Sequence, residues 1–91
     1  MSNIKLKRKH SLSLEEARAA AERVAEELDK EYGLTSRWEG DALRFTRSGV
    51  DGLLKVTKKE VVLDAKLGFL LSAFKSKIES HINDDFDKYF A

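Results

Sequence analysis

The sequence contains no cysteine and no proline. Without cysteine the chain can form neither disulfides nor thiolate metal sites, and a reducing cytoplasm is the simplest compartment for it. Long hydrophobic runs are also missing, because the longest uninterrupted apolar stretch, counting Gly68, covers residues 67–71. A transmembrane helix needs about 20 apolar residues, so the sequence predicts no transmembrane segment. The basic N-terminus lacks the apolar centre of a signal peptide, and we expect a cytoplasmic protein.

The chain also has little excess charge of either sign. It has 17 basic and 16 acidic residues, and its formal net charge is +1. The signs are unevenly placed, since residues 1–12 carry four bases and no acid, whereas residues 13–32 carry seven acids and three bases. One segment therefore offsets the other, and nucleic acid is not a favoured partner on charge alone. At 91 residues the chain is expected to form a single domain, residues 1–91, with a thin core.

The first third of the sequence predicts a strand followed by a helix. Residues 4–7 alternate apolar and basic side chains, which is the period of a half-buried strand. Ser13 and Glu16 have the spacing of a capping box, and Gly33 suits a left-handed C-terminal cap. Between these signals apolar side chains recur every three or four residues, at Leu14, Ala17, Ala21, Val24 and Leu28. We therefore predict a helix over residues 13–32.

The middle of the sequence predicts four short antiparallel strands. Gly40 and Asp41 fit a two-residue hairpin loop, residues 48–52 form the next turn, and Lys58 with Lys59 forms a third. The first and third loops fix which residues lie opposite one another. The predicted pairs are Glu39 with Ala42, Trp38 with Leu43, Ser36 with Phe45, Val56 with Val61, and Leu54 with Leu63.

The last segment predicts a second helix, over residues 69–90. Its apolar stripe consists of Leu71, Phe74, Ile78, Ile82, Phe86 and Tyr89. The order is therefore β-α-β-β-β-β-α. We predict a two-layer α+β fold, with an antiparallel sheet of about five strands and both helices on one face.

Residues suited to catalysis are few. His10 lies beside Ser11 and Ser13, but the Ser13 hydroxyl is already assigned as a helix cap. His81 has metal-pair spacing with Asp84 or Asp85, but two ligands do not make a site. We expect no catalytic residue, no bound metal and no cofactor, and hence a protein that is not an enzyme.

The outward face of the predicted sheet is basic. Such a face can bind RNA or an anionic surface, which makes a nucleic-acid or ribosome-binding module the second functional hypothesis. Single-strand RNA readers stack bases on aromatic side chains of that face, whereas Trp38 and Phe45 are predicted to point inward. Lysine and arginine also simply keep an exposed sheet soluble. The residues predicted on this face are Lys5, Lys7, Lys9, Arg37, Arg44, Lys55 and Lys66.

The strand-to-helix junction is unusually apolar. We expect Leu71, Phe74 and Ile78 to face the sheet. In that case Phe69, Leu70 and Ala73 lie to the side. They either pack against the small alanines of the first helix or form an exposed contact surface for a partner, a second subunit or a lipid-like ligand. A third hypothesis places a small apolar ligand between the helices and the sheet. The candidate interaction residues are Phe69, Leu70, Ala73, Phe86, Tyr89 and Phe90.

Two segments also carry a family resemblance. The runs FTRSGV at 45–50 and LDAKLGFLL at 63–71, continued by AFK at 73–75, occur together with Ile4 and the run HSL at 10–12. In this order they resemble the polyhydroxyalkanoic acid system family of small bacterial proteins, over nearly the whole chain.

The resemblance implies a bacterial cytoplasm, a gene near those for polyhydroxyalkanoate storage polyester, and a location that includes the granule surface. It brings no catalytic residue. The expected function is a non-enzymatic accessory or regulatory role in polyester storage. That role would depend on hydrophobic contact with the polyester granule, with a granule protein or other partner, or with a second subunit in a homodimer.

Overall fold

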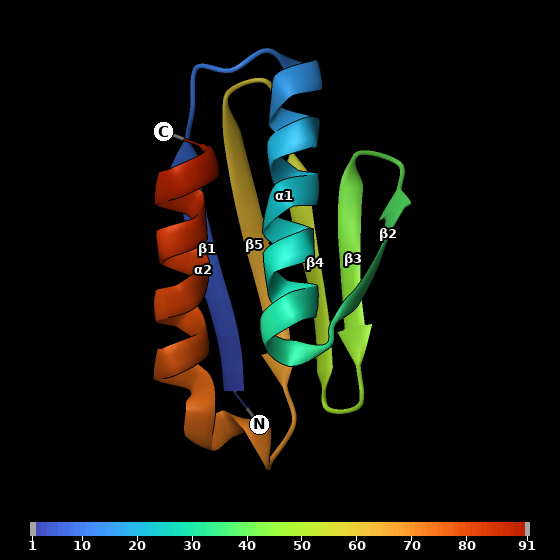
Figure 1. The fold of residues 1–91 in the computed structure, drawn as a ribbon, viewed down its shortest axis with the longest axis vertical. Coiled ribbons are helices and arrows are strands. Elements are labelled where there is room, and N and C mark those ends of the chain that lie inside the picture. Colours follow the sequence, from blue (N-terminus) through green and yellow to red (C-terminus); the bar gives the residue numbers. More distant parts are fainter. Residues whose placement is uncertain (1, 91) are drawn as a thin grey trace.

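The computed structural model describes residues 2–90 as a two-layer α+β fold (Figure 1). Five strands form one antiparallel sheet, and both helices cover the same face of it. The fold class and the predicted element order are therefore confirmed. The elements are β1 (Ser2–Lys9), α1 (Leu14–Tyr32), β2 (Thr35–Glu39), β3 (Ala42–Arg47), β4 (Val50–Val56), β5 (Glu60–Leu67), the short 3₁₀ helix η1 (Leu71–Phe74) and α2 (Lys75–Tyr89).

The strand order in the sheet is β1-β5-β4-β3-β2, and every neighbouring pair is antiparallel. The predicted hairpin registers are confirmed, since Trp38 lies opposite Leu43 and Val56 lies opposite Val61. The turn predicted over residues 48–52 is shorter than expected, because Val50 already begins β4 and Gly52 lies inside this strand. Gly49 alone supplies the positive φ that the turn needs, at 85°.

Helix α1 begins and ends where its caps predict. The Glu16 N–H donates to Ser13 Oγ, and the Ser13 N–H donates to Glu16 Oε1, each over 3.1 Å. These bonds with Ser13 also lower the pKa of Glu16 below its usual range. At the other end Gly33 has a φ of 70°, and its N–H donates to the Asp29 carbonyl over 2.8 Å.

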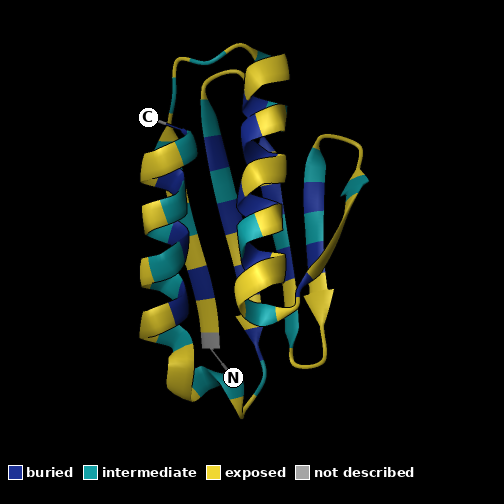
Figure 2. Cartoon of the chain, viewed as in Figure 1, coloured by how far each residue is buried: buried dark blue, intermediate teal, exposed yellow. Residues whose placement is uncertain are grey.

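The core lies between the sheet and the two helices, where Figure 2 shows the buried residues of both layers facing one another. Small side chains on α1 bring its backbone close to the sheet. The buried alanines of α1 are Ala17, Ala20, Ala21 and Ala25. Helix α2 contributes the larger buried groups Ile78, Ile82 and Phe86. Figure 1 shows β2 and β3 extending beyond α1 at the edge of the sheet.

The second α-helix is shorter than the predicted range of 69–90. It begins at Lys75 and follows the 3₁₀ turn η1, while Phe69 and Leu70 lie in the preceding bend. The Gly68 carbonyl accepts hydrogen bonds from the N–H groups of Leu71 and Ser72, over 3.1 Å and 3.0 Å. The Ser72 hydroxyl also donates to this carbonyl. Because several donors bond to this one carbonyl, the chain forms a tight 3₁₀ turn before α2 begins.

Candidate interaction surface at the β5–α2 junction

Four apolar residues project from the bend between β5 and α2. Phe69 is 85% exposed, Leu70 is 81% exposed and Phe74 is 54% exposed. Ala73 is exposed beside them. We call Phe69, Leu70, Ala73 and Phe74 the apolar turn. The interpretation that residues 69, 70 and 73 pack against the first helix is therefore wrong, and the expectation that Phe74 faces the sheet is wrong as well.

The apolar turn is held against the core by one inward side chain. Leu71 is half-buried and packs against the core cluster. A β-carbon placed on Gly49 would lie only 3.3 Å from Leu71 Cδ1, so the glycine leaves the space that Leu71 needs. Gly68 donates its N–H to the Gly49 carbonyl over 2.7 Å. With Leu71 turned inward and Gly68 tied to the neighbouring turn, the side chains at 69 and 70 project into solvent.

The candidate residues at the far end of α2 belong to the core instead. Phe86 is 1% exposed and Phe90 is 2% exposed, and their rings make an edge contact with centroids 5.7 Å apart. Tyr89 is half-buried, and its hydroxyl donates to Glu27 of α1 over 3.3 Å. The placement of Phe86, Tyr89 and Phe90 on an interaction surface is thus corrected. Helical spacing alone does not distinguish a stripe that faces a neighbouring helix from one that faces solvent.

The apolar turn occupies one end of the molecule. Figure 1 shows it beside the turn between β3 and β4, at the end of the sheet opposite to the C-terminus. Between positions 65 and 78 the charged residues are three cations, Lys66, Lys75 and Lys77. Lys66 and Lys77 are exposed, and Lys75 is partly exposed. Apolar side chains flanked by lysines are typical of a surface that contacts an apolar phase with a polar boundary.

The seven basic residues of the second hypothesis do share the outer face of the sheet, and four acids, Glu39, Asp51, Glu60 and Asp64, lie among them. Across the sheet one row consists of Lys5, Asp64, Leu53, Arg44 and Arg37. Arg44 donates to Glu39 over 2.9 Å and to Asp51 over 2.7 Å. These bonds raise the pKa of Arg44, and the bond with Arg44 is the largest cause that lowers the pKa of Glu39. Lys7, Arg37 and Arg44 are ion-paired on this face, so part of its positive charge is compensated. Among the described residues no ion pair joins the other four bases, Lys5, Lys9, Lys55 and Lys66.

Trp38 follows Arg37 in the sequence, but its side chain points to the other side of the sheet. Trp38 donates its Nε1–H to Glu22 of α1 over 2.8 Å, and the guanidinium carbon of Arg18 lies 3.9 Å from its ring centroid. The prediction that Trp38 points inward is confirmed. A flat ring for stacking a base is thus turned away from the basic side chains, which weakens the case for single-strand RNA binding.

The two histidines act as structural links. His10 donates its Nε2–H to the Thr57 carbonyl over 2.8 Å and accepts the Leu12 N–H at Nδ1 over 3.1 Å. His81 Nδ1 and the Tyr32 hydroxyl form a hydrogen bond, which joins α2 to the end of α1. Burial raises the pKa of Tyr32, so the phenol stays protonated at neutral pH. Within residues 2–90 no three potential metal ligands cluster together.

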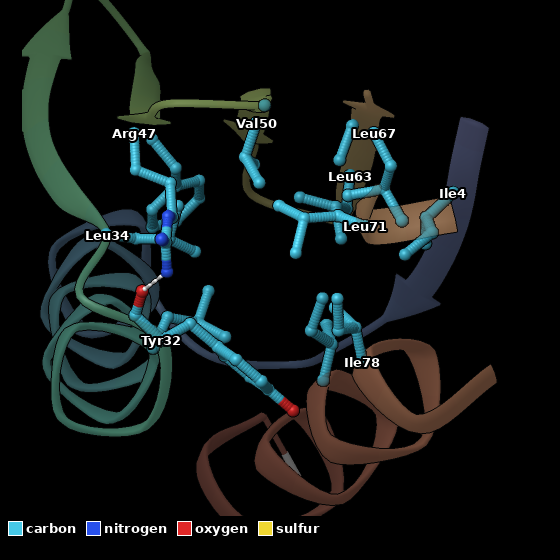
Figure 3. Close-up of a pocket in the computed structure, with 14 residues that line it drawn as sticks. Ile4, Tyr32, Leu34, Arg47, Val50, Leu63, Leu67, Leu71 and Ile78 are labelled. Carbon is cyan, nitrogen blue, oxygen red and sulfur yellow. Dashed lines mark hydrogen bonds between the residues drawn. The ribbon is translucent and has the colours of Figure 1, made fainter. Parts of the chain in front are cut away.

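An apolar cavity of about 40 Å³ lies between the layers, close to the apolar turn (Figure 3). Sequence reasoning proposed a ligand between helices and sheet without locating a site, and no local pattern indicates one. The lining comes from both helices, from β1, β3, β4 and β5, from Leu34 and from η1. Its residues are Ile4, Leu28, Tyr32, Leu34, Phe45, Arg47, Val50, Gly52, Leu63, Ala65, Leu67, Leu71, Ile78 and Ile82.

A family model described as "Putative polyhydroxyalkanoic acid system protein" matches residues 4–90. The chain belongs to this family. The match includes most of β1, the other four strands, both helices and the apolar turn, so the resemblance seen in the sequence extends over nearly all of the described fold. No curated protein shows significant similarity to the chain. In this polyhydroxyalkanoic acid system protein, none of the helices formed by residues 2–90 is long and apolar enough to cross a membrane.

Proposed function

We propose that this protein is a non-enzymatic accessory or regulatory protein of polyhydroxyalkanoate storage that contacts the polyester granule through its apolar turn. The observation that carries the proposal is the exposure of Phe69 and Leu70. Among residues 2–90, the large hydrophobic side chains classed as exposed are Phe69, Leu70 and Phe74, and all three lie in this turn. The family match supplies the link to the polyester.

The chemistry of the turn suits an apolar phase better than a folded protein. A stable protein–protein interface uses about 20–30 residues on each side, whereas the apolar turn offers four. A polyester surface is a continuous apolar phase, so side chains at the tip of the molecule can enter it without a shaped partner. Each large side chain that is fully transferred from water contributes roughly 1.5–3 kcal/mol. Three such side chains predict a reversible association.

The lysines beside the turn set its orientation. Lys66, Lys75 and Lys77 can keep their ammonium groups in water while their methylene stems lie along an apolar boundary. The turn would then enter the surface while the sheet and helices remain outside. In this arrangement the outer sheet face and the helix surfaces stay available to other components of the storage system.

A sedimentation assay with purified polyester granules tests the proposal. Wild-type protein should sediment with the granules, and Leu70→Asp should leave most of the protein in the supernatant. Ser76→Asp is the matched control, because it adds the same charge at an exposed position near Lys75 and Lys77 without removing apolar surface. It should sediment like the wild type. Equal sedimentation of wild-type protein and folded Leu70→Asp would refute the proposal.

The same variants distinguish a granule from a second subunit. Analytical ultracentrifugation reports the oligomeric state of each protein without granules. If Leu70→Asp converted a dimer to a monomer but still bound granules, the turn would be a subunit interface instead.

A further inference from the structure

The cavity between the layers has a definable mouth. Ten of its 14 lining residues are buried, and four are partly or fully exposed. These four are Tyr32 at the end of α1, Arg47 at the end of β3, Val50 at the start of β4 and Leu71 in η1. Figure 3 shows them around an open space, with Leu71 and Val50 facing Tyr32 across it. The cavity therefore opens beside the turn between β3 and β4.

Two small residues on neighbouring strands create the space. Gly52 lies opposite Ala65 in the β4–β5 pair, and both are buried on the helix side of the sheet. A β-carbon on Gly52 would approach Ala65 Cβ to 3.2 Å, so Gly52 cannot easily be replaced by a larger residue. The sheet therefore presents little side-chain volume to the two helices at this point. An unfilled apolar space forfeits packing contacts, and a ligand tail would restore them.

The mouth carries one charged group. Arg47 is the charged residue among the lining residues. The cavity wall is almost wholly apolar, so Arg47 lines it with its aliphatic stem, and its guanidinium lies at the rim, where Nη1–H donates to the Tyr32 carbonyl. A guanidinium has five N–H donors in a planar fork, so this bond leaves donors for an anion. The Tyr32 hydroxyl is already bonded to His81. The site therefore combines an apolar interior with a single cationic, carboxylate-matching group at its entrance.

We infer that this cavity binds the hydrocarbon tail of a short unbranched carboxylic acid, with the carboxylate held by Arg47 at the mouth. The volume limits the tail. One water-sized group needs roughly 10–15 Å³ of such space, so the cavity accommodates about three to four methylene-sized groups. An acid of five carbons fills this space with its carboxylate outside, and an acid of six carbons also leaves the carbon next to the carboxylate at the mouth.

This site is separate from the surface assigned to granule contact. The side chains of Phe69, Leu70 and Phe74 do not line the cavity, whereas Leu71 does. Leu70→Asp should therefore abolish granule sedimentation and leave acid binding unchanged. A cavity variant should show the reverse, with acid binding lost and granule sedimentation normal. The two results together would show that acid binding and granule contact use different sites.

Titration of methyl-labelled full-length protein with sodium hexanoate, followed by NMR, tests the inference directly on the wild type. Saturable shifts are expected for the methyl groups of Leu34, Val50 and Ile78. Affinity should rise from butanoate to hexanoate and stop rising by decanoate, because longer tails exceed the cavity. Absence of saturable shifts, or shifts confined to Leu70, would overturn the inference.

Two variants test the roles of the mouth and the interior. Arg47→Gln should weaken hexanoate binding about tenfold and leave methyl hexanoate binding unchanged, because only the acid carries the charge. Arg37→Gln removes an exposed arginine on the opposite face of the sheet and should change neither. Ala65→Leu should fill the cavity and abolish binding of both compounds. Equal hexanoate affinity in the wild type and Arg47→Gln would contradict the assignment of Arg47.

Discussion

The backbone N–H of Gly68 donates to the carbonyl of Gly49 over 2.7 Å, across two turns that are 19 positions apart in the sequence. This bond ties the end of β5 to the turn between β3 and β4. A β-carbon built on Gly68 would lie 3.4 Å from both the Cα and the carbonyl oxygen of Gly49, which is van der Waals contact, so the two turns lie directly against one another. The apolar turn and the mouth of the cavity both depend on this contact for their positions.

Replacing Gly49 by alanine should destabilise the protein by about 1–2 kcal/mol. The backbone at this position has a φ of 85°, which alanine adopts only with strain, and the new methyl group would meet Leu71 Cδ1 at 3.3 Å. Gly33→Ala is the matched control, because Gly33 has a φ of 70° but no neighbour within 4 Å of the added carbon. Urea denaturation should show a larger loss for Gly49→Ala. An equal or smaller loss would mean that the contact with Leu71 has no energetic effect.

Substitutions at Leu70 and at Phe86 should differ sharply in their effect on the free energy of unfolding. Leu70→Ser should change the free energy of unfolding by no more than about 0.5 kcal/mol, because the side chain is already in water. Phe86→Ala should lower it by about 3–5 kcal/mol, because a buried ring leaves a cavity. Denaturation curves of both variants measure the contrast. A large loss for Leu70→Ser would show that the apolar turn is packed.

The carboxyl group of Asp85 should make stability fall as pH rises. Burial, reinforced by the charge of Glu27, raises its pKa to about 6 from 3.8. Between about pH 4 and pH 6 the folded protein therefore holds a proton that the unfolded chain has lost. Linkage then requires the contribution of Asp85 to the free energy of unfolding to decline over this pH range and to stay low above it.

Asp85→Asn removes this titration. After a discount for solvent screening of a half-exposed group, the variant should be more stable than the wild type by about 1 kcal/mol at pH 7 and equal to it at pH 4. Asp84→Asn removes the carboxylate of the exposed neighbour and serves as the control. Thermal unfolding of the three proteins at several pH values provides the comparison. A constant difference between Asp85→Asn and the wild type from pH 4 to pH 7 would contradict the raised pKa.

Loss of the cap on α1 should also be measurable. Ser13→Ala removes the acceptor of the Glu16 N–H and should cost about 1 kcal/mol. Ser11→Ala, at an exposed position outside the helix, should have almost no effect. Chemical denaturation of both variants separates the cap from a general effect of removing serine. Equal stability of Ser13→Ala and the wild type would show that solvent replaces the cap without loss.

The features predicted correctly from sequence have local causes. Ser13 and Gly33 bound α1 because capping bonds involve residues within a turn of the helix. The register of the β2–β3 hairpin follows from Gly40, because a two-residue loop leaves one pairing of the adjoining strands. Alternation then assigns a face to each strand residue, which is how Trp38 was placed on the helix side.

The features missed have causes that lie far apart in the chain. Phe69 and Phe90 are the same residue type on one predicted helix, yet one is 85% exposed and the other 2% exposed. The difference arises because Gly49, in another turn, accepts the Gly68 bond and shortens the helix, while Phe90 lies against Phe86 and His10.

The amino-acid sequence by itself determined the elements, their order and the faces of the strands, since each depends on neighbours within a few positions. The tertiary structure decided which apolar groups remain in water and where space remains in the core. Those outcomes depend on contacts between segments whose relative positions only the assembled sheet defines.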